Sequence, residues 1–253
     1  MVDSENTTAI LLAGGRGTRL GVITRDKPKP LIPVSGRPFI EWVALQLSQI
    51  GVRQFVVSVG YRATDFDAWR SLNVFEKPPF LPGSSVEMSV ESEPLGTGGA
   101  VINALPMCGR YTIVANADSL VLGSLATLCQ VREQYEAAIC AVYSAEGSRY
   151  GTLECNARWE LKEFREKVAG SGWINAGVYT FKTSLLQSLK CGEKQFLSME
   201  RDVVPRLLQA GHCVKVVPLV GAEMLDIGTP ESLSRADMFV SKWSSLRSSF
   251  GDE

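Results

Sequence analysis

The chain has 253 residues, of which 45% are hydrophobic, and a formal net charge of −1. A chain of this length can bury a sizeable core, and one α/β domain of this size is common. A charge so close to zero gives no bulk basic field of the kind that binds nucleic acids or anionic membranes. We therefore expect no nucleic-acid or membrane partner, and any local positive cluster points to a small anionic ligand.

The histidine and cysteine content excludes several kinds of site. His212 is the only histidine, which excludes Ser-His-Asp triads and metal sites with several histidines. The six cysteines are scattered without a C-x-x-C pair, so we expect reduced core residues rather than disulfides or zinc ligands. The N-terminus is polar and acidic, unlike a signal peptide, and no apolar run is long enough to cross a bilayer. These features predict a cytoplasmic protein.

The first predicted element is a buried strand that runs into a glycine-rich loop. Apolar residues 9–13 precede glycines at positions 14, 15 and 17, which remove the Cβ atoms that would keep an anion off the main chain. Arg16, Arg19 and Lys29 bring three cations to the same stretch. One phosphate does not require three cations, so the pattern favours a ligand with several phosphates.

Two better-known glycine loops do not match this stretch. The P-loop pattern is absent, because no Gly-Lys-Ser/Thr follows at the required spacing. The dinucleotide fingerprint G-x-G-x-x-G begins with Gly15 and Gly17 but reaches Leu20 where the third glycine belongs. An NAD-type oxidoreductase is therefore disfavoured.

The rest of the first half alternates between helices and strands. Pro38 opens a helix that ends at Gly51, because proline suits a first helical turn and glycine the position after the last. Residues 93–100, EPLGTGGA, form a second glycine loop that opens a helix to about residue 105. The other predictions are strands at 54–59, 86–92 and 111–115, a helix at 65–72 and an irregular loop at 76–85.

The second half is richer in short strands. The predictions are helices at 125–135 and 198–208, the latter capped by Ser198, strands at 138–143, 212–217 and 223–226, shorter strands within 150–181, and a last helix from Pro230 to about residue 243. Residues 1–245 are expected to form one domain, followed by a frayed tail at 246–253.

This order of elements predicts an α/β fold with a Rossmann-like mixed, mostly parallel sheet flanked by helices. Ligands of such sheets bind beyond the carboxyl ends of the strands. Gly14, Asn116 and Asp118 each follow a predicted strand, so we expect them in one crevice.

Further motifs along the chain carry a family resemblance. They are GGRGTRL at 14–20, Lys29 within KPKP, EPLGTGGA at 93–100, NAD at 116–118, Tyr150-Gly151, Glu166-Lys167, INAG at 174–177 and DIGTP at 226–230. The ordered set resembles the sugar-1-phosphate nucleotidylyltransferases, which join a nucleoside triphosphate to a sugar 1-phosphate. EPLGTGGA and the expected lack of a C-terminal hexapeptide-repeat domain are most similar to the mannose- and heptose-1-phosphate guanylyltransferases, above all the single-domain, capsule-type D-glycero-D-manno-heptose enzymes.

The resemblance implies a nucleotide-diphospho-sugar transferase (GT-A-like) fold and Mg²⁺ as cofactor. The implied substrates are GTP and D-glycero-α-D-manno-heptose 1-phosphate, which would give GDP-heptose for a capsule or surface polysaccharide. It also admits a homodimer, because homo-oligomers are common in the family. In the implied reaction the sugar phosphate attacks the α-phosphorus in line and pyrophosphate leaves, so the protein has to offset negative charge rather than supply a nucleophile.

The resemblance also assigns roles to individual residues. Catalysis falls to Arg19, which would grip the departing pyrophosphate, and to Lys29, which would sit by the α-phosphate. The implied Mg²⁺ ligands are Asp118 and Asp226, whose hard oxygen atoms suit this metal. The implied nucleotide-binding residues are Ala13, Gly14, Gly15, Gly17, Thr18, Glu93 and Gly98, with Glu93 a candidate to read guanine. The implied sugar-phosphate-binding residues are Gly151, Glu166, Lys167, Asn175 and Gly177.

Several alternatives stay open. The reaction could use mannose 1-phosphate, another sugar, or UTP or CTP. A non-catalytic regulatory subunit that binds a nucleotide sugar would not need Arg19, Lys29 and both aspartates together. Asp118 could instead cap a helix, Asp226 could be a turn residue, and Glu93 could only support its own loop.

Overall fold

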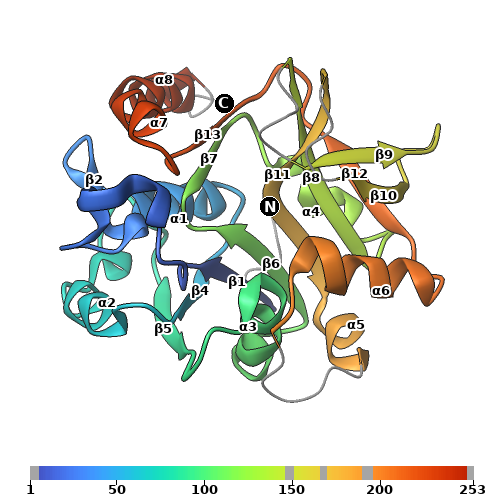
Figure 1. The fold of residues 1–253 in the computed structure, drawn as a ribbon, viewed down its shortest axis with the longest axis horizontal. Helices are drawn as coiled ribbons and strands as arrows, with labels where there is room; N and C mark the ends of the chain where they lie inside the picture. The colour runs from blue at the N-terminus through green and yellow to red at the C-terminus, as the bar shows by residue number, and fades with distance from the viewer. Residues whose placement is uncertain (1–5, 146–150, 166–169, 190–195, 250–253) are drawn as a thin grey trace.

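The computed structural model describes residues 6–145, 151–165, 170–189 and 196–249. Its centre is a β-sheet whose first half is parallel (Figure 1). Strand β1 (Thr7–Leu12) lies between β4 (Gln54–Val59) and β6 (Tyr111–Asn116), and β5 (Ser85–Val90) pairs with β4. Because these four strands run in one direction, the loops after their carboxyl ends meet at one edge of the sheet.

The other half of the sheet is mixed. Strand β11 (Gly172–Lys182) runs antiparallel to β6, and β8 (Ala137–Ser144) runs antiparallel to β11. The remaining strands are β9 (Thr152–Cys155), β10 (Leu161–Arg165) and β12 (Val214–Pro218), of which β12 is parallel to β8. The predicted fold class, a mixed α/β sheet with a parallel first half, is confirmed.

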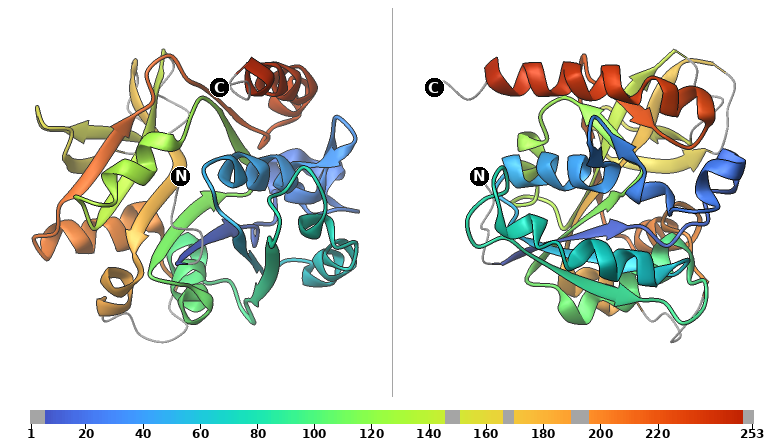
Figure 2. Two further views of the ribbon diagram at one scale, coloured as in Figure 1. Left: turned by 180° about the vertical axis from the view of Figure 1, so that it is seen from behind. Right: turned by 90° about the vertical axis from the view of Figure 1, so that its left-hand side faces the viewer.

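Both faces of the sheet are covered, which explains why β1 is apolar without alternation. Ala9 and Leu11 belong to one hydrophobic cluster, together with residues of α1 (Phe39–Gln49) and α8 (Ala236–Ser249). Ile10 belongs to the cluster on the opposite face, with residues of α3 (Gly96–Ala104) and α6 (Val204–Gln209). Figure 2 shows the sheet between these layers from two further sides.

Shorter elements connect these parts. The short helices are α2 (Ala63–Arg70), α4 (Ala126–Val131), α5 (Thr183–Ser188), α7 (Pro230–Ser234), η1 (Thr18–Thr24), η2 (Lys29–Leu31), η3 (Val74–Glu76), η4 (Leu105–Met107) and the π-helical η6 (Met199–Val203). Two small antiparallel sheets pair β13 (Glu223–Asp226) with β7 (Ser119–Leu122) and β2 (Pro33–Val34) with β3 (Arg37–Pro38). Within the described ranges, no helix is both long and apolar enough to cross a membrane.

Some predicted helices differ in the structure. The helix expected at 198–208 is divided into η6 and α6, because Pro205 has no N–H to continue the ladder and the Asp202 and Val203 N–H groups both donate to the Ser198 carbonyl. The last helix is divided into α7 and α8 at Arg235, and α8 continues to Ser249. The helix expected at 125–135 ends at Val131.

The early end of α4 coincides with a buried arginine. Arg132 follows the helix, donates a hydrogen bond to the Thr7 hydroxyl at 2.8 Å, and lies over the Tyr111 ring at 4.4 Å. Strand β7 and the β2–β3 hairpin were not predicted, since runs of four and two residues are too short for a periodic signal.

Candidate functional site

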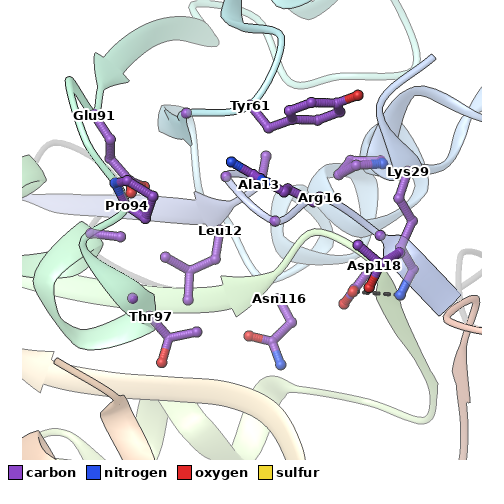
Figure 3. A pocket seen from close by; sticks show the side chains of 18 of the residues that line it. Leu12, Ala13, Arg16, Lys29, Tyr61, Glu91, Pro94, Thr97, Asn116 and Asp118 are labelled. Carbon is purple, nitrogen blue, oxygen red and sulfur yellow. Dashed lines mark hydrogen bonds and ion pairs between the residues drawn. The ribbon is translucent and has the colours of Figure 1, made fainter. Parts of the chain in front are cut away.

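The glycine-rich loop leaves the carboxyl end of β1 and passes close to Glu91 and Lys29 (Figure 3). A Cβ at position 14 would lie 2.8 Å from Glu91 Oε1, so a larger residue there would displace the Glu91 carboxylate. Gly17 has a φ of +61°, and a Cβ there would lie 3.2 Å from Lys29 Cβ. A Cβ on Gly15 would meet nothing within 4 Å. Two of the three glycines are therefore needed for packing, while the third faces open space.

A cavity of about 700 Å³ lies beside this loop; we call it the first cavity. It collects most of the residues assigned to the nucleotide and to catalysis. Those residues are Ala13, Gly14, Gly15, Gly17, Thr18, Arg19, Lys29 and Glu93, and the proposed metal ligand Asp118 lines the same cavity. The cavity is also lined by residues to which no role was assigned from the sequence, among them Tyr61, Glu91, Thr97 and the largely exposed Phe196.

Gly98 is the one proposed nucleotide residue outside this lining. Its N–H donates to the Leu197 carbonyl at 2.7 Å, and a Cβ there would lie 2.6 Å from Val203 Cγ2. The structure therefore gives Gly98 a packing role, in which the absent side chain lets the segment after Phe196 lie directly on α3.

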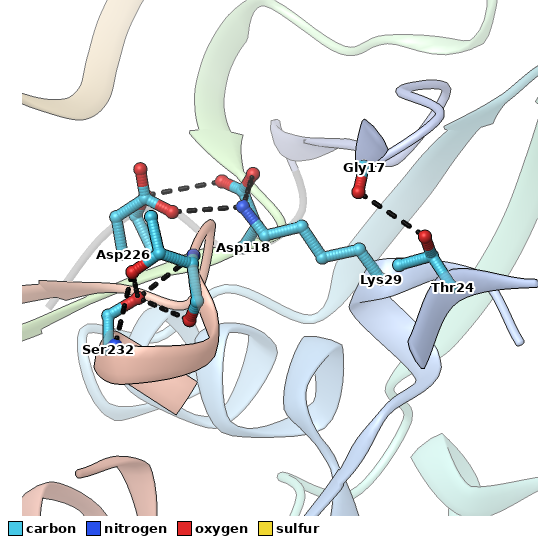
Figure 4. A network of polar contacts seen from close by, with 8 residues as sticks. Gly17, Thr24, Lys29, Asp118, Asp226 and Ser232 are labelled. Carbon is cyan, nitrogen blue, oxygen red and sulfur yellow. Dashed lines mark hydrogen bonds and ion pairs between the residues drawn. The ribbon is translucent and has the colours of Figure 1, made fainter. Parts of the chain in front are cut away.

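Lys29 is the centre of a charged cluster at the end of the first cavity (Figure 4). Its side chain is buried, and Nζ lies 2.6 Å from Asp118 Oδ2 and 2.9 Å from Asp226 Oδ1. Asp118 follows β6, and Asp226 is the last residue of β13, which pairs with β7. The pairing of two short strands thus brings together carboxylates that are far apart in the sequence.

Arg19 reaches the same place. A Cβ on Gly228 would lie 2.7 Å from Asp226 Oδ1, 3.1 Å from Lys29 Nζ and 3.2 Å from an Arg19 guanidinium nitrogen. A side chain at position 228 would displace these charged groups from their present positions. The two predicted cations and the two predicted carboxylates therefore converge at one point of the structure.

A second cavity, of about 870 Å³, lies on the other side of the cluster. Gly151, Asn175 and Gly177, which the resemblance assigned to the sugar phosphate, line it together with Asp226. Glu166 and Lys167 lie outside the described residues. Among the described residues, only Arg19 and Asn116 line both cavities, so these two side chains mark the seam between them.

The second cavity contains a fixed carboxylate. Glu200 Oε1 accepts from the Tyr179 hydroxyl at 2.7 Å and from Asn175 Nδ2 at 3.4 Å, and Oε2 accepts from the Ser198 hydroxyl at 2.9 Å. Burial raises the pKa of Tyr179 well above its ordinary value, and the charge of Glu200 raises it further, so the tyrosine stays a neutral donor. Glu200 was missed in the sequence because its surroundings indicated only a helix cap.

Asn175 is occupied by these internal contacts. Its Nδ2 also donates to the Tyr179 hydroxyl at 2.6 Å, and its Oδ1 accepts from the Gly177 N–H at 2.8 Å. The Asn175 side chain thus stabilises the bulge in β11 and holds Glu200 in place. Glu200 and Arg201 are the residues of η6 that line this cavity.

Comparisons with known proteins agree with this geometry. The family model described as "Nucleotidyl transferase" matches residues 8–242. The D-glycero-alpha-D-manno-heptose 1-phosphate guanylyltransferase of Campylobacter jejuni is 30% identical over 88% of this chain and 95% of its own. The mannose-1-phosphate guanylyltransferase of Mycobacterium tuberculosis is 30% identical over 92% of this chain and 64% of its own.

A solved structure of HddC from Yersinia pseudotuberculosis complexed with GMP-PN has a TM-score of 0.75 at 28% identity and covers 92% of this chain and 99% of its own. The match to the family model spans both cavities and all four residues of the charged cluster. The chain belongs to the nucleotidyl transferase family, and it is a sugar-1-phosphate nucleotidylyltransferase.

Proposed function

We propose that the protein transfers a guanylyl group from GTP to a manno-configured sugar 1-phosphate and releases pyrophosphate. D-glycero-α-D-manno-heptose 1-phosphate and mannose 1-phosphate are the two acceptors to test, since relatives named for each are equally similar to this chain. The observation that carries the proposal is the position of Lys29 in the first cavity, held between Asp118, which lines the first cavity, and Asp226, which lines the second. In this proposal GTP occupies the first cavity and the sugar phosphate the second.

The charge cluster suits this chemistry. The attacking phosphate is already an anion, so the enzyme needs no activated nucleophile and has instead to bring two polyanions together. Lys29 and Arg19 supply positive charge at the seam, and the loop at Gly15 supplies open main chain. Lys29 has little freedom to move, because its stem packs against Gly17 and its ammonium group is held by two carboxylates.

Mg²⁺ fits the same residues. Asp118 and Asp226 each place one oxygen within hydrogen-bond distance of Lys29 Nζ, so two hard carboxylates lie close together and would hold the ion beside the ammonium group. In the described part of the chain, no group of three or more His, Cys, Asp or Glu side chains could hold a metal on its own. Magnesium commonly uses one or two carboxylates and completes its shell with water and substrate phosphates. When bound it would offset phosphate charge.

The proposed specificity rests on two carboxylates. Glu93 lies in the exposed rim of the first cavity and could accept from the N1–H and exocyclic amine of guanine. Glu200 presents a carboxylate that Tyr179, Asn175 and Ser198 hold in place, which suits it to accept from a sugar hydroxyl.

The test is a panel of reactions scored by pyrophosphate release. GTP, ATP, CTP, UTP and dTTP are each combined with mannose, heptose and glucose 1-phosphates in the presence of Mg²⁺, and kcat/KM is measured for each pair. We expect GTP with one of the manno-configured acceptors to exceed every other pair by at least about 100-fold, as for sites that discriminate by hydrogen bonding. Preference for another base, or for glucose 1-phosphate, would contradict the proposed substrates.

A further inference from the structure

Asn116 occupies the seam between the two cavities. It is the last residue of β6, and its side chain lines the first cavity with the glycine loop and the second cavity with β11 (Figure 3). A reaction that joins a ligand of one cavity to a ligand of the other has to place its reacting atoms at this seam. Arg19, the other residue common to both cavities, has a long side chain from the short helix η1, whereas Asn116 is short and fixed to the end of a central strand.

The amide group of Asn116 is available to a ligand. The residue is partly exposed, and within the described part of the chain its side chain makes no hydrogen bond. The neighbouring polar side chains differ in this respect, since Asn175, Glu200 and Asp118 are all held by other groups. A carboxamide carries two donors and one acceptor and normally finds partners when it is partly buried.

Gly177 fixes the position of this amide. Gly177 has a φ of +70°, and a Cβ there would lie 2.6 Å from Asn116 Nδ2 and 3.0 Å from Asn116 Cγ. The Asn175 side chain holds this turn through the Gly177 N–H. Any other residue at position 177 would displace the amide, so the bulge of β11 serves to seat Asn116 with Nδ2 on the side of the second cavity.

We infer that Asn116 is a substrate-contacting residue that donates a hydrogen bond from Nδ2 to a phosphate oxygen of the sugar 1-phosphate and orients it for attack. This inference rests on the proposed division of the substrates between the two cavities. A second phosphate oxygen forms the bond to the α-phosphorus as the bond from that phosphorus to the α,β-bridging oxygen breaks, and pyrophosphate departs with that electron pair. Asn116 keeps its protons throughout, and its amide makes no hydrogen bond to Asp118 or Asp226 within the described part of the chain.

The experiment compares Asn116→Ala and Asn116→Asp with Asn103→Ala. Asn103 is the control, because it is an exposed asparagine on α3 that bonds only the Ser89 hydroxyl among the contacts described and lines neither cavity. For each protein, calorimetry gives the Kd of mannose 1-phosphate and the Kd of GTP separately, and pyrophosphate release gives kcat and KM. Thermal unfolding verifies that each variant is folded.

We expect Asn116→Ala to weaken mannose 1-phosphate binding by about 10- to 100-fold, the usual effect of losing a hydrogen bond to a charged group, while the Kd of GTP stays within about twofold. Asn116→Asp should weaken it further, because a carboxylate repels the phosphate, and Asn103→Ala should match the wild type. An unchanged Kd for mannose 1-phosphate, or equal losses for both ligands, would overturn the inference. The Kd measurements need no turnover, so they test the role of Asn116 independently. Pyrophosphate release tests the proposed reaction itself.

Discussion

The first cavity is built around a glycine loop, whereas the second is built around a carboxylate that other side chains hold in place. The first cavity is lined by loops that follow parallel strands, with glycines where Glu91 and Lys29 approach the backbone. The second is lined by the mixed half of the sheet and by η6, where Tyr179 and Asn175 hold Glu200. Open main chain recognises any phosphate, while a fixed carboxylate can distinguish hydroxyl patterns. In the proposed function, the first cavity therefore binds the nucleotide and the second selects the sugar, and the chemistry takes place where they meet.

The largest effect on the reaction is expected from a change at Lys29. Lys29→Met keeps the stem that packs against Gly17 but removes the charge. We expect kcat to fall by about 10²- to 10³-fold with little change in the Kd of GTP, because the charge matters most in the transition state. Lys182→Met, a change at a surface lysine paired with Glu136, is the control. Equal losses in kcat and in GTP affinity would mean that Lys29 only anchors the nucleotide.

Asp118→Asn should act on the metal rather than on either organic substrate. The amide keeps the shape of the carboxylate but removes its charge, so we expect the Mg²⁺ concentration for half-maximal rate to rise by more than about tenfold. Titrating the rate with Mg²⁺ measures this. Asp237→Asn, a change at a carboxylate that holds the Ser35 turn, should leave the titration unchanged. A wild-type Mg²⁺ dependence in the Asp118 variant would remove this residue from the metal site.

A smaller and one-sided effect is expected in the second cavity. Glu200→Gln keeps the size of the side chain and should raise the KM of the sugar 1-phosphate by about tenfold, while the Kd of GTP stays within about twofold. Steady-state kinetics with both substrates varied measures the difference. Glu136→Gln, on the surface beside Lys182 and His212, serves as the control. If the Glu200 variant loses affinity for GTP instead, the division of tasks between the cavities is wrong.

The smallest effects are expected at Gly98 and Gly15, which should differ in whether stability or GTP binding is lost. Gly98→Ala places a methyl against Val203 and should lower the free energy of unfolding by about 1–3 kcal/mol through overpacking. Gly15→Ala meets nothing within 4 Å, so it should leave stability unchanged and weaken GTP binding instead. Urea unfolding and nucleotide titration of both variants measure the two quantities. Loss of stability in the Gly15 variant would contradict its assignment to the ligand.

The same contrast explains how far the sequence could predict the site. The first cavity depends on contiguous motifs, so the residues 13–19 and Lys29 could be found from glycine and charge spacing. Asp226 was assigned to the site only through the family resemblance, because its contact with Lys29, 197 residues away, depends on the β13–β7 pairing and β7 is too short to show a periodic pattern. Glu200 could not be predicted, because its position in the cavity depends on contacts between η6 and two residues of β11, Tyr179 and Asn175.

The fold class was easier to predict from the sequence than the boundaries of individual helices. Apolar strands separated by helical segments indicate an α/β sheet whatever the details of each loop. The division of the helix at 198–208 depends on Pro205 and on the double use of the Ser198 carbonyl, which only the packed structure reveals.

The central claim is that the two substrates meet at Lys29, one in each cavity. A crystal structure with Mg²⁺, a non-hydrolysable GTP analogue and a sugar 1-phosphate tests it most directly. We expect the α-phosphate within about 4 Å of Lys29 Nζ, the base beside Glu93, and the sugar in the cavity that contains Glu200. An α-phosphate bound in the second cavity, or a sugar phosphate bound away from the seam at Asn116, would contradict the claim.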